Sequence, residues 1–263
     1  MKDLTGIELF LLDLDGTIYI GESEIEGSFD TIRKIREAGK KVCFFTNNSS
    51  RAHTDYIDKL GRMGLSIDET EIYTSGQVTA EFLSRNFQGK RVFLLGNKKL
   101  KQEFSYYDIE VVETKPDVLV LGFDTTLTYN KLNRFCKFLA SGAPYIATHP
   151  DLNCPDKIAP MPDVGAMTEL IRLTVGRSPD YIMGKPYTYA GDAIMQRYNL
   201  PAEKIAMVGD RLYTDIQFAI NNKFASVLVL SGETTPGMAA LSPTKADFTL
   251  NSFKEIFSLT KAK

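Results

Sequence analysis

Short apolar runs recur along the chain, and several of them end in polar residues. The first run extends from Ile7 to Leu12, with one glutamate among its apolar residues, and leads directly into Asp13-Leu14-Asp15-Gly16. A run of this length without polar alternation is typical of a strand buried on both faces of a parallel sheet. The pattern predicts further strands at residues 41–45, 91–95, 117–121, 144–148, 205–208 and 225–230.

Between these strands, apolar residues at helical spacing predict helices. In the segment 129–141, Leu132, Phe135, Cys136 and Leu139 follow the i, i+3, i+4, i+7 spacing of one helix face. Similar patterns predict helices at 26–38, from residue 51, at 77–86, at 189–198, around Met167, Leu170, Ile171 and Val175, and around Ile216, Ala219 and Ile220. Residues 18–25 are predicted to form a short hairpin or flap, and residues 153–165, with their prolines, a loop. Such alternation of strands and helices predicts parallel sheets joined by right-handed crossovers.

The composition is that of an ordinary globular protein. The chain has 263 residues, of which 43% are hydrophobic, enough for one large domain or two smaller ones. Its net charge of -2 provides no basic field for nucleic acid or an anionic membrane. No apolar run reaches the roughly 20 residues that span a bilayer, and the first five residues leave no room for a signal peptide. Three cysteines far apart in the chain, without zinc-type spacing, favour a reduced cytoplasmic protein.

Polar side chains of complementary chemistry follow several predicted strands. Because the carboxyl ends of parallel strands share one edge of a sheet, we expect these side chains to converge. Carboxylates so close together repel one another unless a cation or a proton intervenes, and Mg²⁺ prefers oxygen ligands. A lysine ammonium and loop amides suit a phosphate group. The pattern therefore predicts a site for Mg²⁺ and phosphate, formed by Asp13, Asp15, Thr46, Asn47, Lys185, Asp210 and Asp215.

Each motif by itself also has a purely structural explanation. An Asp-x-Asp segment is typical of a turn at the end of a strand. Lys185 precedes a proline and could be an ordinary surface lysine. Gly209-Asp210 with Asp215 is compatible with the start of a helix, because aspartate favours N-caps and first turns. The order of the motifs, each after an apolar strand, favours the functional interpretation.

Four motifs resemble those of the haloacid dehalogenase (HAD) superfamily of phosphotransferases. They are Asp13-Leu14-Asp15-Gly16-Thr17, Thr46-Asn47-Asn48, Gly184-Lys185-Pro186 and Gly209-Asp210-Arg211-Leu212-Tyr213-Thr214-Asp215. The likeness runs nearly end to end and is greatest to the NagD-like branch, which includes p-nitrophenyl-phosphatases and phosphoglycolate or pyridoxal phosphatases. It implies an α/β fold, with a doubly wound, Rossmann-like parallel-sheet core and a smaller inserted α/β cap.

The resemblance also implies a role for each motif residue. Asp13 would be the nucleophile that forms an aspartyl-phosphate, and it would also contact the metal. Asp15 would be the general acid/base and would offer Mg²⁺ its backbone carbonyl. Asp210 would be a direct metal ligand, and Asp215 would hold a water of the metal or Lys185. The transferred phosphoryl group would be bound by Thr46, the amide of Asn47, and Lys185.

The spacing of the motifs predicts where the cap is inserted. The interval from Asp13 to Thr46 has room for a flap and one helix, whereas that from Thr46 to Lys185 has room for a whole α/β unit. We therefore predict a cap at residues 78–178 within a core of residues 1–77 and 179–263. This matches the branch of the superfamily with the larger α/β cap.

The cap is expected to choose the substrate, because the core motifs bind only the phosphoryl group. The candidate contacts are His149, Asp151 and Asp163, which lie after a predicted strand or in the proline loop. Relatives often carry asparagine where this chain has His149. A locally hydrogen-bonded loop histidine is the alternative for His149, and His53 is expected to be solvated.

The predicted function is Mg²⁺-dependent hydrolysis of a small phosphorylated metabolite, such as a sugar phosphate, a nucleoside monophosphate or a similar phosphomonoester. A dehalogenase is disfavoured because it does not need Asp15, and a phosphonatase because no cap lysine stands out for a Schiff base. A phosphotransferase or phosphomutase on the same core stays open. So does a non-catalytic metabolite-binding module, which loss of Asp13, Asp15 or Asp210 would have favoured. We expect a small metabolite as partner, neither nucleic acid nor membrane, and leave a homodimer open.

Overall fold

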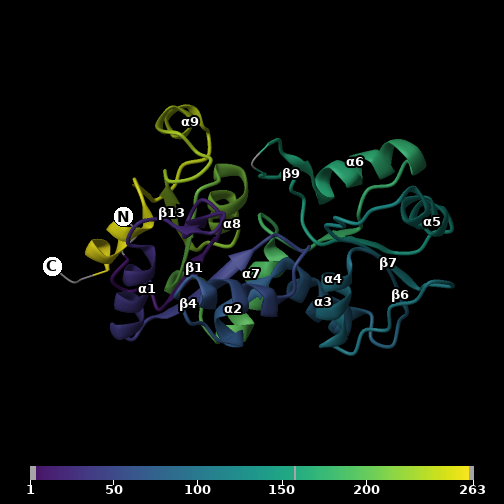
Figure 1. Cartoon of the computed structure of the whole chain (residues 1–263), viewed down its shortest axis with the longest axis horizontal. Helices are drawn as coiled ribbons and strands as arrows, with labels where there is room; N and C mark the ends of the chain where they lie inside the picture. The colour runs from purple at the N-terminus through teal and green to yellow at the C-terminus, as the bar shows by residue number, and fades with distance from the viewer. Residues whose placement is uncertain (1–3, 157, 261–263) are drawn as a thin grey trace. The chain divides into compact units, whose positions relative to one another are not determined.

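The predicted strands form two separate parallel sheets in the computed structural model, which describes residues 4–156 and 158–260 (Figure 1). The six-stranded sheet has the order β14-β13-β12-β1-β4-β5, and the four-stranded sheet has the order β11-β8-β7-β6. Each sheet belongs to one of two units: Met1–Thr46, Ile57–Tyr73 and Lys185–Lys263 form the first, and Asn47–Tyr56 and Thr74–Gly184 form the second. The expectation that no signal peptide is present refers in part to residues 1–3, which lie outside the described ranges.

The first unit contains the six-stranded sheet, its helices and a small hairpin. Its strands are β1 (Leu9–Leu12), β2 (Tyr19–Ile20), β3 (Ser23–Glu24), β4 (Lys41–Thr46), β5 (Ile72–Thr74), β12 (Ile205–Gly209), β13 (Ala225–Val229) and β14 (Phe248–Leu250). Its helices are α1 (Ser28–Glu37), α7 (Thr188–Tyr198), α8 (Gln217–Asn221) and α9 (Pro236–Leu241), with most of α2 (His53–Arg62). Short helical turns are η1 (Glu69–Glu71), η2 (Ala202–Lys204), η3 (Leu212–Ile216) and η4 (Phe253–Leu259). The predicted flap at residues 18–25 is confirmed as the antiparallel hairpin β2–β3.

The strand order explains where a ligand site can form. From β1 the chain builds the sheet outward through β4 and β5, and later from β12 outward through β13 and β14. The pairs β1–β4, β1–β12, β12–β13 and β13–β14 are all parallel. The building direction therefore reverses between β1 and β12. In doubly wound sheets, ligands bind at such a switch point beyond the carboxyl ends of the strands.

Burial on both faces fixes the central strands, as their apolar sequences predict. All four residues of β1 and all five of β12 are buried. A parallel strand in this position is covered by helices on both sides, so each residue, not every second one, must be apolar. The carboxyl end of β1 therefore has a rigid base, and the polar residues that follow it inherit a fixed position.

The second unit contains the four-stranded sheet, with every pair parallel. Its strands are β6 (Val92–Leu95), β7 (Val118–Leu121), β8 (Tyr145–Ala147) and β11 (Tyr181–Ile182), and its helices are α3 (Ser75–Asn86), α4 (Lys98–Ser105), α5 (Tyr129–Ala140) and α6 (Val164–Val175). Residues of β6, β7 and β8 pack with those of α5 and α6 in one apolar core. In Figure 1, α5 and α6 lie on one side of this sheet and α3 and α4 on the other.

Three local predictions in this unit are wrong. The segment 153–165 is not wholly a loop, because β9 (Asn153–Cys154) and β10 (Met161–Pro162) pair in a short antiparallel hairpin. The helix α4 was missed because it is short and has only two buried apolar side chains, Leu100 and Phe104, after its N-cap Asn97. His53 is not solvated: it is buried, and its Nδ1 lies 2.8 Å from Oε1 of Glu103.

The domain boundary predicted at residue 178 differs from the end of the second unit. The strand β11 pairs in parallel with β8, so Tyr181 and Ile182 extend the smaller sheet. The unit ends at Gly184, immediately before Lys185, and it begins at Thr74 with an additional piece at 47–56. The sequence could not show this because a two-residue strand has no hydrophobic period of its own. The division into a core and an inserted cap stays a prediction.

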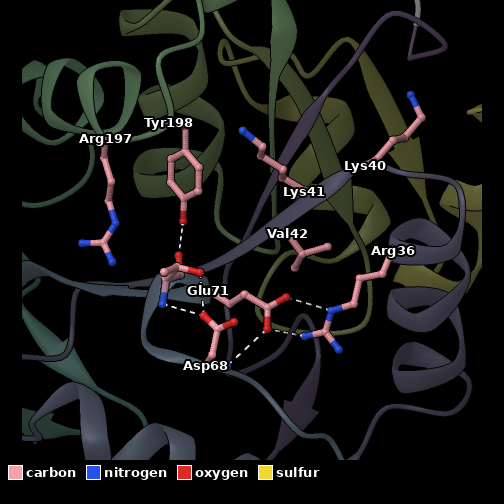
Figure 2. Close-up of a pocket in the computed structure, with 9 residues that line it drawn as sticks. Arg36, Lys40, Lys41, Val42, Asp68, Glu71, Arg197 and Tyr198 are labelled. Atoms are coloured by element: carbon pink, nitrogen blue, oxygen red, sulfur yellow. Dashed lines mark hydrogen bonds and ion pairs between the residues drawn. The ribbon is translucent and has the colours of Figure 1, made fainter.

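A pocket of about 470 Å³ lies at the amino edge of the larger sheet, where β4 begins (Figure 2). Its lining includes Arg36, Lys40, Lys41, Asp68, Glu71, Arg197 and Tyr198. Arg36 donates to both carboxylate oxygens of Glu71 at 2.8 Å, and Lys40, Arg197 and Tyr198 donate to main-chain carbonyls. Cations here also suit the carbonyl ends of α1 and α7. These polar groups thus join helix ends to the sheet, at the edge opposite Thr46.

Membrane-spanning helices are absent from the part of the chain that the structure describes, since none of its helices is both long and apolar enough.

The helix α6 offers a test of the packing, because one of its predicted core residues faces outward. Leu170 is 46% exposed, whereas its neighbour Ile171 is fully buried. Truncation of a buried isoleucine removes apolar contacts and leaves a cavity, so Ile171→Ala should lower the free energy of unfolding by about 2–5 kcal/mol. Leu170→Ala, the matched control, should lower it by about 1 kcal/mol or less. Urea denaturation followed by circular dichroism measures both, and equal losses would contradict the observed orientation of α6.

Candidate active site

The ammonium group of Lys185 lies at the centre of the polar cluster beyond β1. It is 2% exposed, and its Nζ donates to Oδ1 of Asp13 at 2.6 Å and to Oδ1 of Asp215 at 2.7 Å. A third bond, of 3.2 Å, goes to the carbonyl oxygen of Phe45 in β4. The lysine therefore joins the end of β1, the end of β4 and the turn η3 that follows β12 in the first unit. The possibility that Lys185 is an ordinary surface lysine is excluded.

Two carboxylates contact this ammonium, and a third, that of Asp210, lies beside them. Ligand atoms of Asp13, Asp210 and Asp215 lie within 4.8 Å of one another. Burial raises the pKa of Asp13 well above its usual value, Asp215 and Asp210 act in the same direction, and Lys185 opposes the rise. Burial and the charge of Asp215 also raise the pKa of Asp210 to about 6. These shifts show that ionising all three carboxylates together is costly, because one ammonium cannot neutralise three negative charges.

Burial and the neighbouring carboxylates have opposite effects on the pKa of Lys185. Burial by itself lowers the pKa of this ammonium, but the carboxylates of Asp13 and Asp215 together raise it above its usual value. Lys185 therefore keeps its charge at physiological pH. It can hold an anionic oxygen as well as the two aspartates.

Two glycines create the space that these carboxylates occupy. Gly209 ends β12, and a Cβ atom there would lie 2.2 Å from Cγ of Asp215. Gly16 has a positive φ of 85°, and a Cβ on it would lie 2.5 Å from Oδ2 of Asp210. Any larger residue at either position would push an aspartate away from the cluster. The glycines of the sequence motifs thus have a steric role.

Asp15 differs from Asp13 in its environment. The side chain of Asp13 is only 15% exposed, and its amide donates to Val208 in β12, which extends the sheet by one residue. Asp15 lies beyond the strand and is itself exposed, in a turn whose other residues are largely buried and which bridges to Tyr19 at the start of the hairpin. The two aspartates therefore do not belong to one extended strand. The turn sets the position of Asp15.

The predicted phosphate-binding residues fall on a unit boundary. Thr46 is the last residue of β4 and is buried, and Asn47, also buried, is the first residue of the second unit. Within that unit, Nδ2 of Asn47 donates to Oδ1 of Asp151 at 2.9 Å, and its carbonyl oxygen accepts from Ser75. The structure brings Thr46 to the same strand end as Phe45, whose carbonyl holds Lys185.

A loop that follows β13 supports the cluster and was not predicted to take part. The amide of Glu233 donates to Oδ2 of Asp210 at 2.6 Å, and Oγ of Ser231 donates to the carbonyl oxygen of Gly16 at 2.7 Å. A Cβ atom on Gly232 would lie 2.0 Å from Oδ2 of Asp210. The sequence offered one sign of this loop, the dipeptide Ser231-Gly232 after an apolar strand. The dipeptide has no charged group, so it did not stand out as part of a polar site.

The donor set fits a hard divalent cation. Oδ1 of Asp210 is buried and makes no hydrogen bond within residues 4–156 and 158–260, and excess negative charge surrounds it. Burying an unsatisfied carboxylate oxygen is costly unless another group compensates for its charge. Magnesium, which takes carboxylate and carbonyl oxygens and keeps several waters, would do so. Asp210, Asp13 and the turn at Asp15 are the groups able to hold it.

The three predicted cap residues are brought together within the second unit. His149 is fully buried, with Nδ1 3.9 Å from Oδ2 of Asp151 and Nε2 3.6 Å from Oδ1 of Asp163. Asp163 is also the N-cap of α6, since its Oδ1 accepts from the amide of Val164 at 2.7 Å. Asp151 is bound by Asn47, as described above. Their contact with a substrate stays a prediction.

Comparison with known proteins gives consistent relationships. The family described as haloacid dehalogenase-like hydrolase matches residues 10–110, and that described as HAD-hydrolase-like matches residues 182–256. An acid sugar phosphatase of Staphylococcus aureus is 31% identical, over 86% of this chain and 87% of its own. The 5'-nucleotidase YutF of Bacillus subtilis is 29% identical, over 86% and 88%. The crystal structure of a 4-nitrophenylphosphatase from Thermotoga maritima has a TM-score of 0.96 and 44% identity, and covers 98% of this chain and 99% of its own.

Cation binding can be tested without measuring catalysis. We expect Mg²⁺ to raise the midpoint of thermal unfolding, because it binds the folded carboxylate cluster and relieves its repulsion. At a hundredfold excess over its dissociation constant, a ligand stabilises the folded state by about 2.7 kcal/mol. Asp210→Asn should lose most of this shift, and Asp30→Asn, an exposed carboxylate of α1, should retain it. Equal shifts in wild type and Asp210→Asn would show that the cation binds elsewhere.

Proposed function

Since the chain belongs to the haloacid dehalogenase-like hydrolase family, we propose that it is a phosphatase that hydrolyses small phosphomonoesters with Mg²⁺, through an aspartyl-phosphate on Asp13. The observation that carries the proposal is the position of Lys185 between Asp13 and Asp215, with an uncompensated oxygen of Asp210 in the same cluster. A surplus of fixed negative charge beside one ammonium suits a cation and a phosphate together. A purely structural ion pair would have balanced charges.

Asp13 is the nucleophile of the first step. Lys185 fixes Oδ1 of Asp13, which leaves Oδ2 to attack phosphorus. The new bond joins this oxygen to phosphorus, and the bond from phosphorus to the ester oxygen breaks. A carboxylate nucleophile divides the hydrolysis into two steps with lower barriers. The intermediate is then a phosphorylated Asp13.

Asp15 moves the protons of both steps. In the first step it gives its proton to the departing ester oxygen, and the alcohol leaves neutral. In the second step it takes a proton from water, whose oxygen attacks phosphorus while the bond to Asp13 breaks. Inorganic phosphate is released, and Asp13 and Asp15 return to their starting forms. The exposure of Asp15 gives it access to both the leaving group and water.

The remaining core residues hold the phosphoryl group. Lys185 offers its positive charge, Thr46 its hydroxyl group and Asn47 its backbone amide. In phosphoryl transfer, charge spreads over the oxygens, so donors placed in advance lower the barrier. Asp215 holds Lys185 at 2.7 Å and so keeps the ammonium in place through both steps. Magnesium, held by Asp13, Asp210 and the carbonyl of Asp15, would offset charge on the phosphate and carboxylates.

The substrate class we propose is a small phosphorylated metabolite, with sugar phosphates and nucleoside monophosphates first. The names of two relatives, an acid sugar phosphatase and a 5'-nucleotidase, support this choice. A cytoplasmic location is supported by the wide spacing of the cysteines at 43, 136 and 154, which is not that of a disulfide framework. Whether the enzyme forms a homodimer stays a prediction.

The covalent step is tested at Asp13. Asp13→Asn should abolish phosphate release from a panel of phosphorylated metabolites, because an amide cannot attack phosphorus. Circular dichroism should show that the variant folds. Steady turnover in Asp13→Asn, after deamidation and contaminating phosphatase are excluded, would refute the mechanism.

The cap residues are tested by their effect on substrate preference. We expect His149→Asn and Asp163→Asn to change the ranking of substrates, by about 1–3 kcal/mol in the specificity ratio for a lost polar contact. The asparagine at 163 retains an oxygen that can cap α6, so loss of the cap is avoided. The control is Asp156→Asn, which replaces an exposed aspartate between β9 and β10. If both rankings match the control, these side chains only hold their loops together.

A further inference from the structure

A lysine outside the proposed machinery is buried beside the hairpin that follows Asp15. Lys59 lies in α2 and is 5% exposed. Lysine is almost never buried to this extent without a compensating partner, because loss of hydration penalises its charge. Its Nζ is 3.7 Å from the centroid of the Tyr19 ring and 3.8 Å from Oε1 of Glu22, whose side chain is largely exposed. Of Tyr19 and Glu22, only Tyr19 therefore offers Lys59 a buried contact, through the face of its ring.

Tyr19 connects this lysine to the turn of the proposed acid/base. The Tyr19 ring is fully buried, and its residue begins β2. Its carbonyl oxygen accepts from the amide of Gly16 at 2.8 Å, its amide donates to Leu14 at 3.3 Å, and it forms a bridge with Asp15. A shift of Tyr19 would therefore move the peptide units on both sides of Asp15.

The rest of the hairpin is also fixed, but at points farther from Asp15. Tyr19 pairs with Glu24 of β3, and a carboxylate oxygen of Glu24 accepts from the amide of Phe29 in α1 at 2.8 Å. This contact anchors the returning strand to α1. Lys59 fixes the outgoing strand to α2, at the residue that bridges to Asp15. The hairpin is thus held on both sides within the first unit.

We propose that Lys59 is a positioning residue, which acts through the face of the Tyr19 ring to hold the turn of Asp15 in its proton-transfer geometry. The inference rests on the proposed acid/base role of Asp15. Asp15 is exposed, so its direction depends on the backbone of the turn more than on burial. The attraction between an ammonium and an aromatic ring is strengthened where water is excluded, which is the situation of Lys59.

The role of Lys59 can be measured by comparing leaving groups. An alkyl phosphate such as glycerol phosphate requires a proton on its departing oxygen, whereas p-nitrophenyl phosphate releases a stable anion that needs little help. In Lys59→Met, which keeps the apolar stem and removes the charge, kcat/KM for the alkyl ester should fall by about ten- to a hundredfold. The fall for the aryl ester should be several-fold smaller. Lys59→Arg should restore most of the loss, because arginine also binds an aromatic face.

Two controls separate positioning from general stability. Arg62→Met removes an exposed cation from the same helix and should leave both esters unchanged. Tyr19→Phe keeps the ring face and should retain the wild-type ratio of the two esters. If Lys59→Met does not fold by circular dichroism, the neutral and polar Lys59→Gln replaces it in the same comparison.

Asp15→Asn distinguishes failure of this inference from failure of the proposed function. Asp15→Asn should show the same preference for the aryl ester, but more strongly. If it does and Lys59→Met lowers both esters equally or neither, Lys59 has no positioning role and the mechanism stands. If Asp15→Asn itself shows no dependence on the leaving group, the acid/base role of Asp15 is wrong, and the role of Lys59 falls with it.

Discussion

The ionic contact of Lys185 with Asp13 and Asp215 is the interaction on which the rest of the site depends. All three side chains are largely withdrawn from water, at N–O distances of 2.6 and 2.7 Å. Charged groups in this environment lose much hydration energy, which is recovered only by close and well-oriented partners. Removal of one partner would leave an uncompensated charge, at a cost of about 3–5 kcal/mol. The contact therefore constrains the ends of β1, β4 and β12 to one arrangement.

That arrangement is possible because of the sheet beneath it. The building direction of the sheet reverses between β1 and β12, so no helix crosses over the gap between their carboxyl ends. Asp13 follows one of these strands, and Asp210 follows the other after Gly209. Apolar residues without polar alternation keep both strands buried and hence rigid. The carboxylates of Asp13 and Asp210 thus follow directly from fully buried strands.

Two further sets of contacts support this centre, one from the loop after β13 and one from the hairpin that follows Asp15. In the loop after β13, the amide of Glu233 binds Asp210 and the hydroxyl group of Ser231 binds the carbonyl of Gly16, beside the proposed cation site. Asp15 is instead exposed, and its backbone is tied to the hairpin through Tyr19, whose buried ring lies against Lys59. A group that alternates between giving and accepting a proton needs contact with solvent and leaving group. An exposed residue on a fixed backbone meets both requirements.

The sequence by itself determined the fold class, the four central strands of the larger sheet (β1, β4, β12 and β13, but not its edge strands β5 and β14) and the residues of the charged cluster. Buried parallel strands leave a continuous apolar signal, and the polar residues that follow them must gather at one edge. Only the tertiary structure decided which atoms meet: that Lys185 contacts Asp13 and Asp215, that Ser231 and Glu233 support the site, and that β11 extends the smaller sheet. It also decided that Lys59 and His53, ordinary polar residues in the sequence, are buried against Tyr19 and Glu103. Backbone amides, two-residue strands and long-range contacts leave no period or charge pattern in the chain, because they depend on residues that only folding brings together.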